Sequence, residues 1–204
     1  FTANGEGSYL SDPGDHGRLA SNGDGPFTLR EKAGVIYRFR SDGLLVSVSD
    51  RNGNTITAGY TGGRLTSLTH SSGQSLKLDY DANGRLLSEA TPLGHTTSYS
   101  YDAVGNLLSK TDANSHTITY MYDALNRLTR TQYRDGTSVA YSYDALGRQV
   151  AMTDGQGTAI YSYDALGRLL KTEGPESNEK ISYAYDALGN RVSMTNQDGQ
   201  IVNY

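Results

Sequence analysis

The sequence has no cysteine and no tryptophan, and its 204 residues include only 4 prolines and 3 phenylalanines. The absence of cysteine excludes a disulfide scaffold and a cysteine-based metal centre. No stretch approaches roughly 18 consecutive apolar residues, so no membrane span is expected. With 18 Lys plus Arg against 22 Asp plus Glu, the chain also lacks the basic surplus that holds phosphates, and we expect no nucleic-acid partner.

Large aliphatic residues are also scarce, and tyrosine takes their place. Leu, Ile, Val and Phe together make up less than a fifth of the chain, whereas there are 16 tyrosines and 24 glycines. Aromatic residues favour strands, and glycine favours tight turns over helices. The composition therefore predicts a protein of strands and turns.

A motif of the form Tyr-Asp-Ala-x-Gly-Arg-Leu recurs six times, with its tyrosines 20 to 22 residues apart. Looser copies continue the series backwards, at Tyr60 before TGGRL and at Phe39 before RSDGLL. The residues that we expect to form the structural repeat are Tyr80, Asp81, Gly84, Arg85, Tyr101, Asp102, Gly105, Tyr122, Asp123, Arg127, Tyr143, Asp144, Gly147, Arg148, Tyr163, Asp164, Gly167, Arg168, Tyr185, Asp186 and Gly189.

The period divides the chain into two regions. Residues 35–204 are expected to hold about eight tandem repeats, and residues 1–34 partial or atypical ones. Tyr204 follows Tyr183 by 21 residues and stands two residues before the position of the next Tyr-Asp pair. We therefore expect the last repeat to be truncated.

Each repeat reads as a β-hairpin. Ile118, Tyr120 and Tyr122 alternate with other residues and share one strand face. Asp and Gly then predict a tight turn, and a second run ends at another turn, such as Asn52-Gly53. This spacing predicts roughly sixteen strands from residue 44 onward and about three before it. The fold class is thus all-β: an extended antiparallel meander that forms a curved or spiralling sheet.

The second runs do not alternate cleanly. Leu65 and Leu68 cannot share a face in a regular strand, and neither can Leu86 and Leu87. Either β-bulges intervene or both sheet faces are partly covered. The sequence leaves both explanations open.

The repeated polar residues favour structural roles over chemistry. His95 and His116 occupy equivalent positions, but adjacent repeats lie two strands apart, too far to share a metal ion. The same spacing separates the repeated Asp residues, which have a role in the turns, while the repeated Arg residues can meet these Asp residues or cover Tyr rings. There is no nucleophile elbow and no phosphate loop. We expect no enzyme activity, no cofactor and no catalytic or metal site.

The Tyr-Asp motifs resemble the YD-repeat, or RHS-repeat, family over about residues 15–204. The resemblance implies a long sheet that spirals into a hollow shell. In bacterial RHS polymorphic toxins and the B/C components of insecticidal toxin complexes, such a shell encloses a C-terminal toxic domain; in teneurins it serves adhesion. The family's Asp-Pro-x-Gly-Leu motif, associated with self-cleavage, is missing, because Asp12-Pro13-Gly14 lies at the wrong end. Neither self-processing nor toxicity is expected of this chain.

The resemblance implies a segment of a shell wall that encloses or presents a C-terminal toxin or effector. The alternative is a cell-surface adhesion module that binds carbohydrate or a protein through its Tyr-rich sheet, because aromatic faces stack on sugar rings. The expected partners are the rest of the parent chain, an enclosed toxin domain and glycans, and open sheet edges predict self-association. The implied location is secreted or at the cell surface.

Overall fold

The computed structural model describes residues 2–3, 8–10, 17–21, 26–176 and 179–204. All regular structure in these ranges is β, which confirms the predicted all-β class. Because the described residues include no helix, none is long and apolar enough to cross a membrane. His16 and the segment Asp12-Pro13-Gly14 lie outside the described residues.

Among the described residues, sixteen strands follow residue 44, as predicted, but five precede it where the sequence predicted about three. The difference arises at the start of the chain, where two strands are only two and three residues long. The strands are β1 (Thr2–Ala3), β2 (Ser8–Leu10), β3 (Arg18–Ser21), β4 (Phe27–Arg30), β5 (Ile36–Phe39), β6 (Leu45–Ser49), β7 (Thr55–Thr61), β8 (Arg64–His70), β9 (Ser75–Tyr80), β10 (Leu86–Ala90), β11 (Thr96–Tyr101), β12 (Leu107–Thr111), β13 (Thr117–Tyr122), β14 (Leu128–Gln132), β15 (Ser138–Tyr143), β16 (Gln149–Asp154), β17 (Gly157–Tyr163), β18 (Leu169–Glu173), β19 (Lys180–Tyr185), β20 (Arg191–Asn196) and β21 (Ile201–Asn203).

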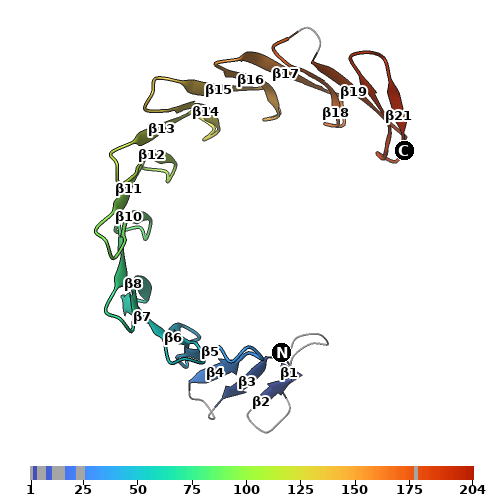
Figure 1. Ribbon diagram of the computed structural model, residues 1–204. Helices are drawn as coiled ribbons and strands as arrows, with labels where there is room; N and C mark the ends of the chain where they lie inside the picture. The colour runs from blue at the N-terminus through green and yellow to red at the C-terminus, as the bar shows by residue number, and fades with distance from the viewer. Residues whose placement is uncertain (1, 4–7, 11–16, 22–25, 177–178) are drawn as a thin grey trace. The chain divides into compact units, whose positions relative to one another are not determined.

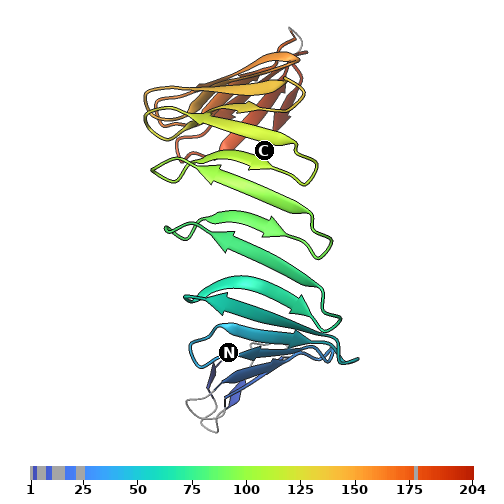
Figure 2. The same ribbon diagram turned by 90° about the vertical axis from the view of Figure 1, so that its left-hand side faces the viewer.

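The chain divides into two compact units, Phe1–Tyr99 and Ser100–Tyr204. In the first unit, each strand from β1 to β10 pairs antiparallel with the next strand in the chain. The same holds in the second unit from β12 to β21, so the predicted meander is confirmed. The strands of each unit follow one another in chain order (Figure 1). They run side by side, with the hairpin turns along two opposite margins (Figure 2). The proposed boundary between residues 34 and 35 stays a prediction.

Most of the described hairpin turns share one geometry. In the turn after β15, Gly147 N–H donates to the Asp144 carbonyl over 3.0 Å, and Asp144 N–H donates to the Arg148 carbonyl over 2.9 Å. Gly147 has a φ of +82°, which glycine adopts without a steric penalty. These contacts make a three-residue loop that ends in a left-handed residue, a common hairpin connection. The turn between Asp50 and Asn54 at the opposite margin is closed in the same way.

We call the turns that follow the motif tyrosines the YD turns. A β-bulge follows each YD turn for which the pairing is defined, and it resolves the irregular alternation of the second runs. Leu86 lies opposite Tyr80, but Ser88 lies opposite Asp79, so Leu87 is the extra residue. Equivalent register shifts occur in six further hairpins. The bulge explanation is confirmed, because the extra residue shifts the alternation by one: Leu65 and Leu68 lie opposite Tyr60 and Ala58 and so share one face.

Each unit is a single-layer sheet. One face carries the paired tyrosines of the repeats, such as Tyr120 and Tyr122. Thr131 lies on the same face, opposite Tyr120 on one neighbouring strand and Val139 on the other. No hydrophobic side chain among the described residues is buried, and the two buried polar residues are Ser47 and Thr131, with exposures of 7% and 6%. Both faces therefore keep contact with solvent, and the strand ladders and side-chain contacts must hold the sheet together.

Candidate functional site

Adjacent hairpins are incompletely paired on the side where the Tyr-Asp turns lie, which we call the YD margin. Within one hairpin, β15 and β16 pair as far as Tyr143 and Gln149. Between hairpins, β14 and β15 pair only from Arg130 opposite Ala140 to Gln132 opposite Ser138. The strand ends near the YD margin therefore lack a backbone ladder to the next hairpin, and side chains fill this gap.

The first set of these side-chain contacts lies inside each YD turn. The Asp144 carboxylate accepts hydrogen bonds from the backbone N–H groups of Leu146 and Arg148, both over 2.9 Å. Its other oxygen accepts a hydrogen bond from Arg148 Nε over 2.6 Å. The same clamp joins Asp81 to Arg85, Asp123 to Arg127 and Asp164 to Arg168. In the turns at Asp102 and Asp186, an asparagine takes the place of arginine and donates from Nδ2 over 2.8 and 2.9 Å.

The second set joins each hairpin to the next. Arg148 Nη1 donates to the carbonyl of Asp164 over 2.9 Å, and its guanidinium lies 4.9 Å from the centre of the Tyr163 ring. In return, the Tyr163 hydroxyl donates to the Gln149 carbonyl over 2.9 Å. We call the Asp–Arg clamp together with these contacts the clasp. The same clasp joins Arg127 to Tyr143 and Asp144, and Arg168 to Tyr185 and Asp186.

The clasp keeps its carboxylates ionised. The backbone N–H of Arg168, together with its guanidinium, holds the pKa of Asp164 below its usual range. Arg127 lowers the pKa of Asp123 in the same way, and Arg85 that of Asp81. A carboxylate with a lowered pKa and both oxygens engaged is poorly suited to donate a proton near neutral pH. The clasp is therefore suited to join hairpins.

The histidines also contact groups in their own turns. His116 Nδ1 lies 3.2 Å from an Asp112 carboxylate oxygen, and His70 Nδ1 lies 2.8 Å from the Ser72 hydroxyl. The backbone N–H of His95 donates to the Thr91 hydroxyl over 3.2 Å. In the ranges that the structure describes, no three or more His, Asp or Glu residues gather in a way that could hold a metal ion.

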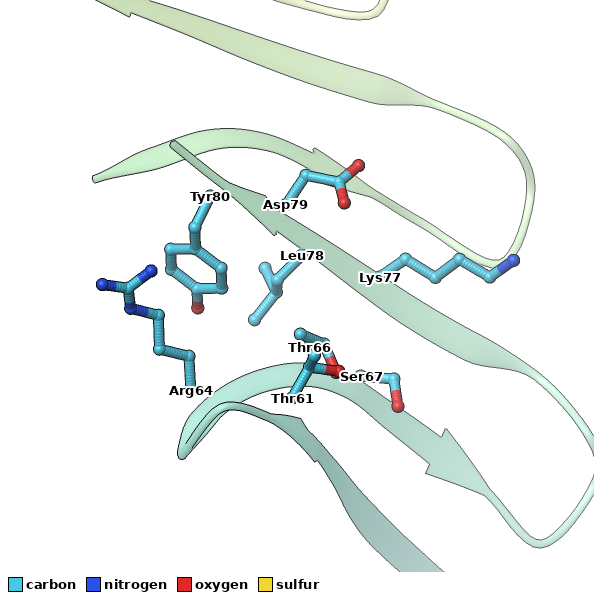
Figure 3. A pocket seen from close by; sticks show the side chains of 8 residues that line it. All are labelled: Thr61, Arg64, Thr66, Ser67, Lys77, Leu78, Asp79 and Tyr80. Atoms are coloured by element: carbon cyan, nitrogen blue, oxygen red, sulfur yellow. The ribbon is translucent and has the colours of Figure 1, made fainter. Parts of the chain in front are cut away.

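The turn between β7 and β8 departs from the motif. Thr61 lies opposite Arg64, and the two residues between them, Gly62 and Gly63, have φ values of +57° and +78°. Two consecutive residues with positive φ form the tighter type I′ turn, which is one residue shorter and has no Asp. A cavity of about 540 Å³ lies beside this turn, between β8 and β9 (Figure 3). It is lined by Thr61, Arg64, Thr66, Ser67, Lys77, Leu78, Asp79 and Tyr80.

Sequence reasoning missed this cavity and a second feature, a row of exposed aliphatic side chains on the YD margin of the second unit. The row occupies the position after Ala in each turn, before the residue with positive φ (Asn126 in one turn and Gly in the others), and its side chains are 70% to 88% exposed. It consists of Val104, Leu125, Leu146, Leu166 and Leu188. The sequence did contain a signal for each feature. The row could have been predicted from the apolar residue that recurs in the turns, and the cavity from the shortened TGGR turn.

A single-layer antiparallel sheet of clasped hairpins, each about 21 residues long, defines the chain as a YD-repeat shell protein. The family model described as Teneurin YD-shell matches residues 75–204, and the chain belongs to this family. The predicted YD-repeat membership is thus confirmed.

Solved structures share this fold. The crystal structure of TcdB2-TccC3 without hypervariable C-terminal region matches with a TM-score of 0.68 and 20% identity, over 89% of this chain and 11% of that one. The crystal structure of TcdB2-TccC3 gives 0.66 and 21%, over 89% and 12%. This chain thus spans about a tenth of the length of these structures. The comparison with curated proteins gave no match.

Proposed function

We propose that the chain is a non-catalytic structural segment in the wall of a YD-repeat shell that encloses or presents a C-terminal toxin or effector domain of its parent chain. The observation that carries this proposal is the single-layer sheet, in which no described hydrophobic residue is buried. Self-sufficient domains bury a core between at least two packed layers. A clasped single layer is better suited to separate two environments than to fold around a core of its own.

The clasp chemistry supports the same proposal. The charged groups that recur in the motif are bound to one another, as Asp144 is to Arg148, or to the next hairpin, as Arg148 is to Asp164. Repeats that contact only their neighbours form extended structures that grow by addition of further repeats. The partners on this view are the rest of the parent chain and the enclosed domain, and the location is secreted or at the cell surface.

Limited proteolysis of the full-length parent protein tests the proposal. We expect the segment that follows the repeats to resist trypsin in the wild type, because a closed wall excludes the protease. The double variant R148Q/R168Q removes two clasps and should make that segment cleavable while the strand content measured by circular dichroism is kept. If trypsin cleaved the segment in the wild type as fast as in R148Q/R168Q, and as fast as an unfolded peptide, the segment would not be enclosed by the wall.

The adhesion alternative requires tyrosine faces that are free to stack on sugars. The Tyr163 ring is covered by the Arg148 guanidinium, and its hydroxyl is bound to a carbonyl, so this ring is poorly placed to stack on a ligand. A glycan array probed with the 204-residue chain separates the two functions. Specific binding of a glycan would favour adhesion, and its absence would favour the wall.

A further inference from the structure

Arg64 occupies the position of the motif arginine, but its turn lacks the aspartate that the motif places before it. In the complete clasps, Arg Nε donates to a carboxylate oxygen over 2.6 or 2.7 Å. The shortened turn before Arg64 has Thr61 where the motif has Asp. Among the described residues the Arg64 side chain makes no ion pair, and its guanidinium makes one hydrogen bond, from Nη1 to the Asp81 carbonyl over 3.4 Å. The guanidinium therefore retains donors that a carboxylate occupies in the other repeats.

The neighbouring carboxylates are not placed to replace the missing acid. The Asp81 carboxylate accepts hydrogen bonds from the backbone N–H groups of Asn83 and Arg85, both over 2.9 Å, and from Arg85 Nε over 2.6 Å. Asp79 also lines the cavity, but its side chain extends to the opposite side of β9 from Tyr80 (Figure 3), where it accepts a hydrogen bond from the Ser88 hydroxyl over 3.4 Å. The exposed Arg64 guanidinium is therefore not occupied by either of these carboxylates and is open to an anionic ligand.

The cavity beside Arg64 suits a small polar molecule. Figure 3 shows the Arg64 guanidinium beside the Tyr80 ring, with Leu78 next to this ring and Thr61 and Thr66 on the facing strands. The two threonine hydroxyls lie 3.4 Å apart and line the same space. Its volume of about 540 Å³ lies within the range of small-molecule sites.

We propose that this cavity binds a small hydroxylated carboxylate, such as a hydroxy acid or a sugar acid, through Arg64. The carboxylate accepts from the guanidinium as the motif Asp does in the other clasps, in the charge-assisted geometry that arginine favours. The carbon skeleton packs against Tyr80 and Leu78. The ligand hydroxyls donate to the oxygens of Thr61 and Thr66, because the Thr66 hydroxyl itself donates to the Gly59 carbonyl over 3.3 Å. The site is independent of whether the chain forms part of a shell wall.

Titration of the ¹⁵N-labelled chain with D-glucuronate, followed through the arginine Nε–Hε signals, tests the site. The Arg64 signal should shift saturably, and the Arg148 signal should stay in place because Asp144 already occupies that Nε. The methyl ester of glucuronate and D-glucose are the neutral controls and should leave the Arg64 signal unmoved. An unmoved Arg64 signal with glucuronate, or an equal shift with the ester, would overturn the proposal.

Two variants sharpen the test. R64Q removes the charge and should weaken glucuronate binding at least about tenfold, the loss expected for one charge-assisted contact. T61D introduces a carboxylate at the position of the motif acid and should weaken binding by competition and repulsion, although Arg64 is kept. Unchanged affinity in either variant, with Tyr80 and Leu78 signals still reporting the folded sheet, would also overturn the proposal.

Discussion

Arg148 serves two hairpins at once, because it binds the Asp144 carboxylate in its own turn and the Asp164 carbonyl in the next. It also covers the Tyr163 ring. A planar guanidinium can make these contacts together, whereas the point charge of lysine cannot. The planar shape of the Arg148 guanidinium should therefore contribute more to stability than its positive charge alone.

Replacement of Arg148 by lysine should lower the free energy of unfolding by about 1 kcal/mol, because the ion pair survives only in part and the contact with the Tyr163 ring weakens. Urea unfolding followed by tyrosine fluorescence measures this loss. R130K is the matched control, since Arg130 is exposed and makes one hydrogen bond, to the Ser138 hydroxyl over 3.0 Å. Equal midpoints for R148K and R130K would contradict the role given to the clasp.

The clasp carboxylates should make stability fall in acid. The pKa of Asp164 is lowered in the folded chain, so the unfolded chain binds more protons at pH values between the folded and unfolded pKa. The resulting stabilisation is complete above about pH 5 and is lost as the pH falls through about 4 and below. Urea unfolding at pH 7, 4 and 3 measures the slope, which should be shallower in D164N. A stability that stays constant down to pH 3 would be inconsistent with charged clasps.

At the scale of elements, the hairpins follow from local sequence. Alternation of residues such as Ile118 and Tyr120 predicted the strands, and Asp144 with Gly147 predicted the turn, because both signals depend on neighbours in the chain. The bulge after each turn was visible only as a conflict between Leu86 and Leu87. The sequence indicated that the repeated Arg residues can meet the Asp residues or cover Tyr rings. It could not predict that Arg148 also donates to the backbone carbonyl of Asp164, because this contact depends on where two hairpins lose their backbone ladder.

The positive φ of the turn glycine gives a prediction for one element. A methyl group added at Gly147 would meet no heavy atom within 4 Å, so G147A should cost roughly 1–2 kcal/mol through backbone conformation alone. G155A is the control, because Gly155 has equally open surroundings and is not among the glycines with positive φ. Thermal unfolding of both variants measures the contrast. A G147A variant as stable as G155A would mean that the turn relaxes without cost.

At the scale of the whole molecule, the open edge of the second unit predicts association. Tyr204 N–H donates to the Val192 carbonyl over 3.1 Å, so by strand alternation the Asn203 N–H points away from β20. Within this unit, no described strand pairs with that outer edge of β21. Unpaired strand edges join to one another.

The 204-residue chain should therefore form dimers as its concentration rises, and N203P should weaken them by removing an outward donor. Sedimentation equilibrium measures the dissociation constant of each. L146S/L166S is the control, since it changes the exposed aliphatic row and leaves the edge intact. If this control, and not N203P, abolished the dimers, association would depend on the row and the edge interpretation would be wrong.

The incomplete pairing at the YD margin also has a mechanical consequence. When a unit is pulled along the direction in which its hairpins follow one another, each backbone ladder between hairpins resists at one margin only, and at the other the force is borne by Arg148 and its counterparts. The hairpins should then open one after another, each releasing about 70 Å of extended chain at roughly 3.3–3.6 Å per residue. Where a repeat has the clasp arginine, this side chain thus sets the tension at which the next length of chain is released.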